Sequence, residues 1–345
     1  MTDIKRVGID LAKTVFHVTA VDEAGAVVAR KRFRRAGLHS YLTLLPPGCL
    51  VAMEACGSAH HWARLALHLG HKVLMMSPHK VAPYTNANKN DVNDADGIVE
   101  ASSRPGMRFV GVKSVEQQHL QQVHRARQLA VKERTAHCNQ LHGFLLEYGI
   151  ESPKGVAVLR RRLAGIVEDA ENELPFNGRV LLRDLGEELR RLDERVKQFD
   201  AQIVAISQAE PACQRLQAIP GIGPLTATAL VAAVGDAAEF RNGRELSAWL
   251  GLVPRQYSTG GRPRLLGISK RGDRYIRYLL IHGARAALRT AGRHDNRRSR
   301  WALEVESRRG RNIATVALAN KNARAAWAIL AKAVTFDSNH LGKAA

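Results

Sequence analysis

The chain has 345 residues, of which 52 are Lys or Arg and 32 are Asp or Glu, so its formal net charge at pH 7 is +20. Hydrophobic residues make up 45% of the chain, which is ordinary for a globular protein and, at this length, enough for two or three domains with their own cores. The basic excess indicates a polyanionic partner, most often nucleic acid. No apolar run approaches the length that a membrane-spanning helix needs, which argues against an integral membrane protein.

The four cysteines, Cys49, Cys56, Cys138 and Cys213, are far apart and have neither metal-ligand nor disulfide spacing. Such cysteines are typical of free thiols in a reducing compartment. The first residues run directly into an apolar strand pattern and do not have the pattern of a signal peptide. We therefore expect a cytoplasmic protein.

The N-terminal part of the chain predicts a mixed sheet. A hairpin signal at residues 22–25 joins two of the expected strands, and helix patterns at 38–45 and 59–69 separate the later ones. Three strands that can pair antiparallel, followed by alternating helices and strands, are typical of an α/β fold. The expected strands are 7–10, 15–21, 27–33, 49–54 and 72–76.

Four acidic residues occupy positions where they can converge. Asp10 and Glu54 each end an expected strand, and Asp91 and Asp94 lie three residues apart at the start of an expected helix, on one face. Carboxylates held close together repel each other unless a cation lies between them, and a hard divalent ion with oxygen ligands is the natural partner. For any one of these acids taken alone, a structural role, such as capping a helix, is the better interpretation. The four in this order favour a metal site.

The middle of the chain is expected to be helical. A long polar helix runs from about residue 115 to 148, and apolar residues then recur at alternating spacings of three and four. This heptad pattern predicts either a coiled coil between chains or an intramolecular hairpin against the preceding long helix. The seam residues are Leu182, Leu185, Leu189, Leu192, Val196, Phe199, Ile203 and Ile206.

The last third is expected to be mainly helical, with two segments suited to phosphate. Gly221 and Gly223 follow Pro220 and precede a helix, as in a helix-hairpin-helix motif, whose turn exposes backbone N–H groups to a phosphate. A plain Pro-Gly junction between helices is the alternative. The arginine-dense stretch 293–311, followed by a closing helix over 312–336, predicts contact with a nucleic-acid backbone.

The second segment is the loop Ser258-Thr259-Gly260-Gly261, which is flexible and lies among basic residues. Such a loop suits either phosphate binding or a serine nucleophile, and the residues alone favour binding. The basic residues expected to contact nucleic acid here are Arg255, Arg262, Arg264, Lys270 and Arg271.

Three motifs together resemble a known family. Asp10 in Val-Gly-Ile-Asp-Leu-Ala-Lys, Glu54 in Met-Glu-Ala-Cys-Gly, and Asp91 with Asp94 in Lys-Asn-Asp-Val-Asn-Asp-Ala are similar to the DEDD tetrad of RuvC-like domains with a ribonuclease-H fold. The detailed resemblance is to transposases of insertion sequence family 110, 1111 subgroup, and covers nearly the whole chain.

This resemblance implies Mg²⁺ as cofactor, bound by the four acids, and a catalytic serine in the Ser-Thr-Gly-Gly loop. We assign Ser258, with Thr259 as the alternative register. It also implies a coiled coil that joins protomers into a dimer or tetramer, and a non-coding bridge RNA that pairs with donor and target DNA. The protein would then be bacterial and associated with the nucleoid when bound to DNA.

The resulting hypothesis is an RNA-guided transposase that excises and inserts its element by Mg-assisted serine attack and strand exchange. Its expected parts are a RuvC-like domain over 1–150, a helical coiled-coil linker over 151–212 and a serine-bearing domain over 213–345. One alternative is a metal-dependent junction-resolving nuclease in which water attacks and Ser258 only binds phosphate. The other is a non-catalytic nucleic-acid-binding protein whose acids are structural.

Overall fold

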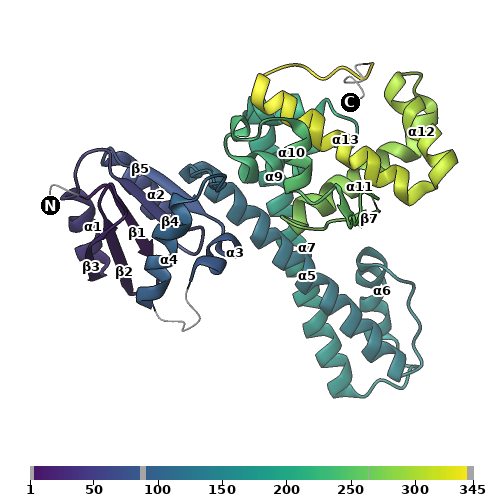
Figure 1. The fold of residues 1–345 in the computed structure, drawn as a ribbon. Helices are drawn as coiled ribbons and strands as arrows, with labels where there is room; N and C mark the ends of the chain where they lie inside the picture. Colours follow the sequence, from purple (N-terminus) through teal and green to yellow (C-terminus); the bar gives the residue numbers. More distant parts are fainter. Residues whose placement is uncertain (1–3, 86–90, 263, 340–345) are drawn as a thin grey trace. The chain divides into compact units, whose positions relative to one another are not determined.

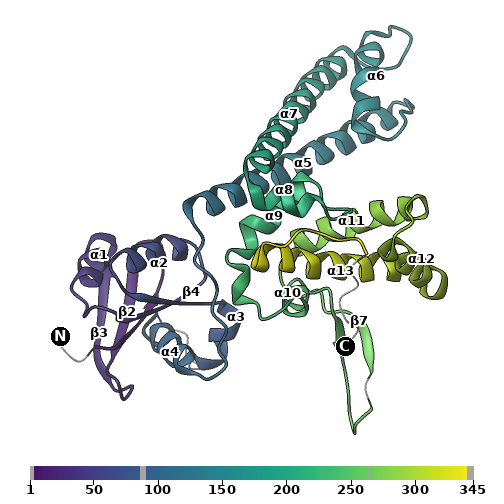
Figure 2. The ribbon, with the colours of Figure 1, turned by 90° about the horizontal axis from the view of Figure 1, so that it is seen from above.

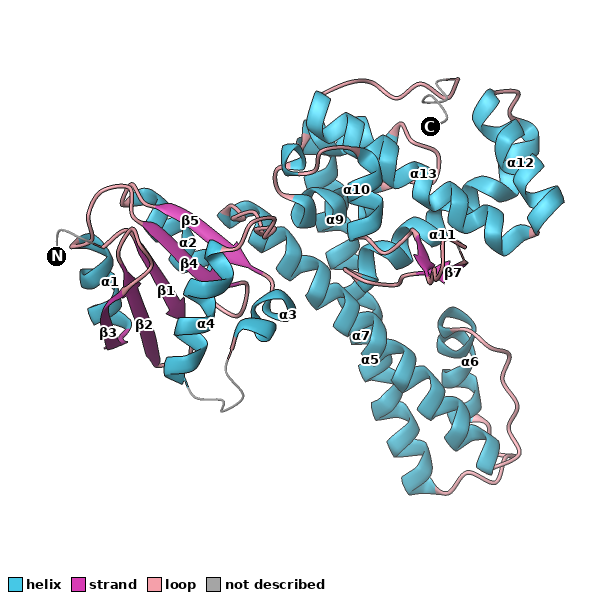
Figure 3. Cartoon of the chain, in the orientation of Figure 1, coloured by secondary structure: helices cyan, strands magenta, loops and turns pink. Residues whose placement is uncertain are grey.

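The computed structural model describes residues 4–85, 91–262 and 264–339. Its contacts divide the chain into two compact units, Met1–Glu116 and Gln117–Ala345. The first is a mixed α/β unit, and the second is mostly helical, with strands only in one small hairpin among its described residues (Figure 3). This confirms the expected combination of an α/β N-terminal sheet and a mainly helical C-terminal region. Among the described helices, none combines the length and the apolar character that crossing a membrane requires.

The first unit is built on a five-stranded sheet of order β3-β2-β1-β4-β5 (Figure 1). The pairs β1–β2 and β2–β3 are antiparallel, whereas β1–β4 and β4–β5 are parallel. All five strands agree with the sequence prediction to within one residue. They are β1 (Arg6–Asp10), β2 (Val15–Val21), β3 (Val27–Arg34), β4 (Leu50–Glu54) and β5 (Lys72–Met76).

Helices cover both faces of this sheet, as the alternation of its side chains requires. On one face Ile9 and Met53 pack with residues of α1 (Arg35–Thr43) and α2 (Ala59–His68). On the other face Ala52 packs with Ile98 of α4 (Asp91–Ser103). Two short helices lead into α4, namely α3 (Pro78–Val81) and the 3-10 helix η1 (Ala82–Tyr84).

Helix α4 crosses β1 at Gly8 with no space for a side chain. A Cβ built on Gly8 would lie 2.6 Å from Val99 Cγ2 and 2.7 Å from the Ala95 carbonyl oxygen. Only glycine permits this approach of helix backbone to strand. The crossing therefore fixes the height of α4 above β1.

The second unit begins with a helical hairpin of α5 (Val115–Glu147) and α7 (Phe176–Ala209), with α6 (Val156–Glu168) packed at its far end (Figures 1 and 2). Arg127 pairs with Asp200 at 2.5 Å, and Arg134 pairs with Asp193 at 2.8 Å. Because seven residues forward on α5 correspond to seven residues back on α7, the two helices are antiparallel.

The predicted heptad seam forms the inner face of this hairpin. Leu182, Leu189, Leu192, Val196 and Ile203 are buried within the chain, and Leu182 and Leu189 share a core with α5 and α6. The intramolecular alternative therefore describes the seam. The buried seam residues pack within their own chain, and the expected coiled coil that joins protomers stays a prediction.

The remaining elements of the second unit surround one core, in which α9, α11 and α13 are central. Buried His124 of α5 ties the hairpin to this core, with Nδ1 3.0 Å from the Tyr275 hydroxyl and Nε2 3.0 Å from Thr228 Oγ1. Desolvation, with a smaller effect of the nearby Arg127 charge, lowers the pKa of His124 to about 4, so it is neutral at pH 7. The elements are α8 (Pro211–Gln217), α9 (Pro224–Val234), η2 (Ala237–Glu239), α10 (Gly243–Trp249), β6 (Pro254–Gln256), β7 (Leu265–Ile268), α11 (Arg274–Thr290), η3 (Ala291–Arg293), α12 (Arg297–Arg309) and α13 (Arg311–Lys332).

The crossing at Gly8 predicts a strong effect of one methyl group. Gly8→Ala should lower the free energy of unfolding of the first unit by about 1–3 kcal/mol, since α4 must move away from β1 to admit the Cβ. The matched control is Gly57→Ala, where a Cβ meets no atom within 4 Å. Urea unfolding followed by circular dichroism measures both. Equal stability of the two variants would contradict the close crossing.

Candidate functional site

Asp10 and Glu54 are neighbours at the carboxyl ends of two parallel strands. Ile9 pairs with Met53 in the register of β1 and β4, so Asp10 and Glu54 are the next residues on each strand. By strand alternation Asp10 shares a face with Gly8, and Glu54 shares a face with Ala52, which is the face covered by α4. The sheet therefore brings together the two strand-end acids that the sequence singled out.

The two acids influence the pKa of the Cys56 thiol. The pKa of its thiol is raised, first by desolvation and then by the negative charges of Glu54 and Asp10. Both carboxylates are thus close enough to act on one thiol. Cys56 was not among the residues predicted for the site, although its position two residues after Glu54 was a signal for it.

The other two acids of the predicted metal site, Asp91 and Asp94, belong to the first turns of α4. Half-buried Asp94 immediately precedes Ala95, whose carbonyl oxygen lies over Gly8 of β1. Asp91 is the first residue of the same helix, and its side chain lies outside the described part of the structure. Within the described part, no three His, Cys, Asp or Glu side chains lie close enough to hold a metal ion. Asp10, Glu54 and Asp94 are carboxylates from three elements, a donor chemistry that suits a hard divalent ion.

Asp96, the third acidic residue of α4, has a structural role. Asp96 accepts a hydrogen bond of 2.6 Å from Thr19 of β2 and pairs with Arg30 of β3 at 2.9 Å. Desolvation opposes its ionisation, but the hydrogen bonds from Arg30 and Thr19 and the charge of Arg30 outweigh this, so its pKa is lowered. Asp96 therefore anchors α4 to the antiparallel side of the sheet.

In the second unit, Ser258 lies on an exposed β-hairpin formed by β6 and β7 (Figure 2). The hairpin turns at Gly260 and Gly261, whose φ angles are 56° and 75°, and the Arg262 N–H donates to the Thr259 carbonyl at 3.1 Å. Positive φ at both central residues is the geometry that glycine supplies in tight hairpins. Ser258 is therefore on the strand arm, one residue before the turn.

The Ser258 hydroxyl has one hydrogen-bond partner among the described residues, the Gln256 side chain, whose Nε2 donates to Oγ at 2.8 Å. Gln256 and Ser258 are two residues apart and so share one face of the arm. This alternation was a signal for Gln256 that the sequence analysis did not use. Tyr257, between them, is 67% exposed.

The base of the hairpin is rigid. Gly251 and Gly272 allow two chain segments to cross, because a Cβ on either would lie within 2.1 Å of a backbone oxygen. Buried Arg277 of α11 donates to the carbonyls of Leu250 and Arg271 at 3.0 and 2.8 Å. Asn320 of α13 adds a hydrogen bond of 3.1 Å to the Leu252 carbonyl. The base of the hairpin is thus held by packing and hydrogen bonds, while the rest of the hairpin is exposed. No local pattern in the sequence predicted that Arg277 and Asn320 hold this base.

The expected basic residues surround this arm. All five are exposed, and none forms an ion pair with any residue that the structure describes, so their charges are open to an anionic partner. Lys270 has a left-handed backbone, with φ of 56°. The five are Arg255, Arg262, Arg264, Lys270 and Arg271.

The two glycines of the expected helix-hairpin-helix turn differ in their surroundings. A Cβ on Gly221 would lie 2.4 Å from the carbonyl oxygen of Gly283 in α11, so close helix packing accounts for this glycine. Gly223 is exposed, caps the N-terminus of α9 and has no atom within 4 Å of a built Cβ. Of the two, Gly223 has the surroundings that a phosphate contact needs.

Comparison with known proteins finds transposases along the chain. Residues 7–150 match a model of DEDD-type transposases of IS110 elements, described as Transposase. Residues 213–300 match a model described as Transposase IS116/IS110/IS902 family.

Three relatives match over nearly their full length. The chain is 49% identical over 331 residues to a probable family 20 transposase of Pseudomonas aeruginosa, which covers 96% of this chain and 98% of that protein. It is 44% identical over 336 residues to the transposase for insertion sequence element IS1111A of Coxiella burnetii, with coverages of 97% and 92%. It is 41% identical over 337 residues to the transposase for IS1328 of Yersinia enterocolitica, with coverages of 98% and 100%.

These matches confirm the resemblance at the level of the family, and the DEDD model suggests dependence on a divalent metal ion. The chain belongs to the IS116/IS110/IS902 family of transposases.

Proposed function

We propose that this transposase cuts and rejoins DNA through a covalent bond between Ser258 and a DNA phosphate. The observation that carries the proposal is the position of Ser258 on an exposed hairpin arm with a rigid base, among five exposed cations without acidic partners in the described structure. A nucleophile for a polymeric substrate must reach a phosphodiester that cannot enter a closed pocket. The arm supplies this access, and the cations offset the negative charge of the phosphate.

The proposed first step forms a bond between Ser258 Oγ and phosphorus and breaks one P–O bond of the DNA backbone. The strand leaves as a hydroxyl that takes up a proton, and the serine proton passes to solvent or to a base. The Gln256 side chain donates to Oγ and so leaves the serine proton free for transfer. Attack by a DNA hydroxyl on the phosphoserine then reverses the chemistry and reseals a strand. Bond number is conserved, so no high-energy cofactor is needed.

We further propose that Asp10, Glu54, Asp91 and Asp94 hold Mg²⁺. The paired strand ends support this, since β1 and β4 place two carboxylates side by side and α4 carries the other two. A bound Mg²⁺ would offset charge on the scissile phosphate. The four carboxylates would hold that ion, and Asp96 fixes the helix that carries two of them to β2 and β3.

We also propose guidance by a structured RNA that pairs with donor and target DNA. Its support in this chain is the net charge of +20, which suits a partner with a phosphate backbone. Phosphate contacts carry no sequence information, so a protein that binds through them needs base pairing or another reader to choose its sites. We expect the active assembly to be a homo-oligomer.

The roles of the acids can be separated by mutation. Asp10→Asn and Glu54→Gln should abolish DNA strand cleavage because they remove metal ligands, while the free energy of unfolding changes little. Asp96→Asn should instead lower the free energy of unfolding by about 1 kcal/mol, because it weakens the anchor to Arg30 and Thr19. Urea unfolding and cleavage of a labelled DNA substrate in Mg²⁺ measure the two effects. Normal cleavage by Asp10→Asn would remove the proposed metal site.

The serine assignment predicts one site of covalent attachment. Ser258→Ala should bind DNA with unchanged affinity and form no protein–DNA adduct on a denaturing gel. The matched control is Thr259→Ala, which removes the neighbouring hydroxyl and should still form the adduct, and peptide mapping should place the adduct on Ser258. Cleavage by Ser258→Ala without an adduct would instead support the nuclease in which water attacks, and an adduct on Thr259 would change the register.

RNA guidance predicts a nucleic acid that purifies with the protein. The wild-type protein should carry a structured RNA whose loops match donor and target sequences, and rewriting one loop should move recombination to the new target. The control is an RNA whose loop is changed only outside the nucleotides that pair with DNA, and it should leave the target unchanged. Efficient recombination by RNA-free protein would contradict the proposal.

A further inference from the structure

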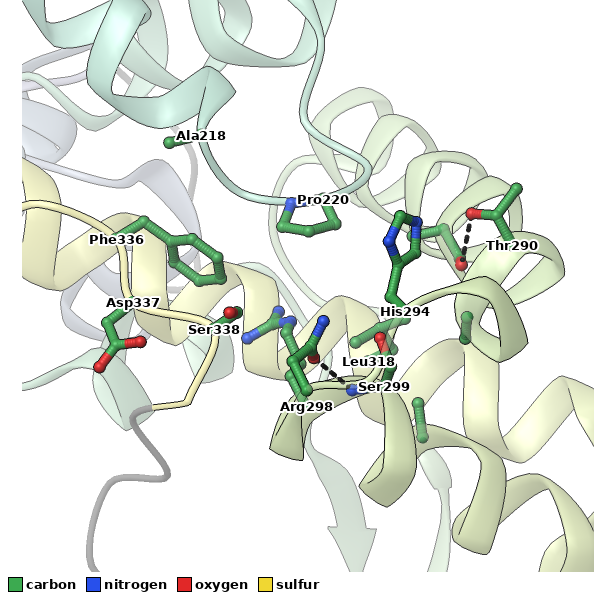
Figure 4. A pocket seen from close by; sticks show the side chains of 14 residues that line it. Ala218, Pro220, Thr290, His294, Arg298, Ser299, Leu318, Phe336, Asp337 and Ser338 are labelled. Carbon is green, nitrogen blue, oxygen red and sulfur yellow. Dashed lines mark hydrogen bonds between the residues drawn. The ribbon is translucent and has the colours of Figure 1, made fainter.

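The second unit contains a cavity of about 570 Å³ that the chemistry described above does not use (Figure 4). Its lining comes from the α8–α9 turn, the end of α11, helix α12 and the segment that follows α13. The volume lies within the range of pockets for small organic ligands. Apolar groups such as Pro220 and Leu318 share the lining with polar ones such as His294 and Ser299.

Arg298 lines this cavity and has an incomplete set of partners. Its side chain is only 6% exposed. Its Nη2 donates to the side-chain oxygen of Asn322. The Asn322 amide is itself oriented, because its Nδ2 donates a hydrogen bond of 3.1 Å to the Pro220 carbonyl. Its Nε is buried and has no hydrogen-bond partner in the described structure, and no carboxylate there pairs with the guanidinium. A buried cation without a counter-ion is costly, so the site favours an anion.

A second cation strengthens this preference. Lys321 lies 3.9 Å above the Trp301 ring, and its pKa is lowered to about 8, first by desolvation and then by the charges of Arg298 and Arg324. Desolvation also lowers the pKa of Arg298 itself to about 10. Burial is the main cause of both shifts, so Arg298 and Lys321 are two cations that solvent reaches poorly. Asp337, an exposed acid in the lining, accepts a hydrogen bond from the Asn339 N–H instead of pairing with Arg298.

The segment after α13 supplies an aromatic wall. The Phe336 ring centre lies 5.3 Å from the Arg298 guanidinium carbon, and Figure 4 shows both side chains among those that line the cavity. Asn339 fastens this segment to α12 through a hydrogen bond of 3.3 Å from the Arg297 N–H. A flat apolar ring beside a buried guanidinium is the combination that accepts a nucleotide, with its base against the ring and its phosphate near the cation.

We propose that this cavity binds the phosphate group of a nucleotide, held by Arg298, with the attached sugar and base against Phe336. The hydroxyl of Ser299 and the ring of His294 are the further polar groups available to the phosphate oxygens. The nucleotide is either the unstacked end of a nucleic-acid strand or a free mononucleotide, which share this chemistry. The proposal depends neither on Ser258 nor on the acids of the first unit.

Calorimetric titration of full-length, nucleic-acid-free protein tests the site. The probes are inorganic phosphate, adenosine monophosphate, and a short single-stranded oligonucleotide with or without a 5′-phosphate. Arg298→Gln should weaken binding of each phosphate-bearing probe at least about 10-fold, since a charged hydrogen bond is lost. The matched control is Arg300→Gln, which removes the same charge from an exposed position on the same helix and should change binding less than about 3-fold.

A second variant tests the aromatic wall independently of the buried charge. Phe336→Ala should weaken binding of adenosine monophosphate several-fold and leave inorganic phosphate unaffected. Tighter binding of the 5′-phosphorylated oligonucleotide than of its unphosphorylated form, with the difference lost in Arg298→Gln, identifies a strand end as the ligand. Binding of adenosine monophosphate that depends on Arg298, without such a difference between the oligonucleotides, identifies a free nucleotide. Equal binding by Arg298→Gln and Arg300→Gln would overturn the proposal. If Arg298→Gln does not fold, the wild type decides, because a melting temperature that is the same in phosphate and in chloride of equal ionic strength overturns it too.

Discussion

The contact of helix α4 with strand β1 at Gly8 is the constraint on which the proposed metal site of the N-terminal unit depends. A strand residue without a side chain lets the helix backbone approach, and the next outward residue on the same strand face is Asp10. The helix is held from its other side by Asp96, through Thr19 and Arg30. Because both contacts hold α4 against the sheet, a substitution that lifts the helix should also displace the acids that the helix carries.

The serine hairpin follows the same principle within the second unit. Glycines permit two backbones to cross at its base, and buried side chains from α11 and α13 hold the crossing by hydrogen bonds to carbonyl oxygens. The arm beyond the base makes no core and leaves Ser258 and its cations accessible. In both places packing fixes the backbone while the side chains proposed to act on DNA stay outside the core, as expected for an enzyme whose substrate is a long polymer.

The strands and the two strand-end acids could be predicted because they depend on local periodicity and on alternation along a strand, which the sequence displays directly. The heptad seam could be found but its partner could not, since the same spacing serves a second chain or the preceding helix. The separation of Asp96 from Asp91 and Asp94 needed a tertiary contact, because three acids on one short segment look alike until Arg30 is brought beside one of them. Gly221 likewise resembled a phosphate-binding turn until α11 was placed against it.

The central claim is that a DNA phosphate passes through a bond to Ser258, and the stereochemistry at phosphorus tests it most directly. Each in-line displacement inverts the configuration of the phosphorus atom. A DNA substrate with a single phosphorothioate of known configuration at the scissile position would be recombined by the wild-type protein, and the configuration at the new junction determined. Two displacements through phosphoserine predict net retention. Net inversion would show a single direct displacement and contradict the covalent route.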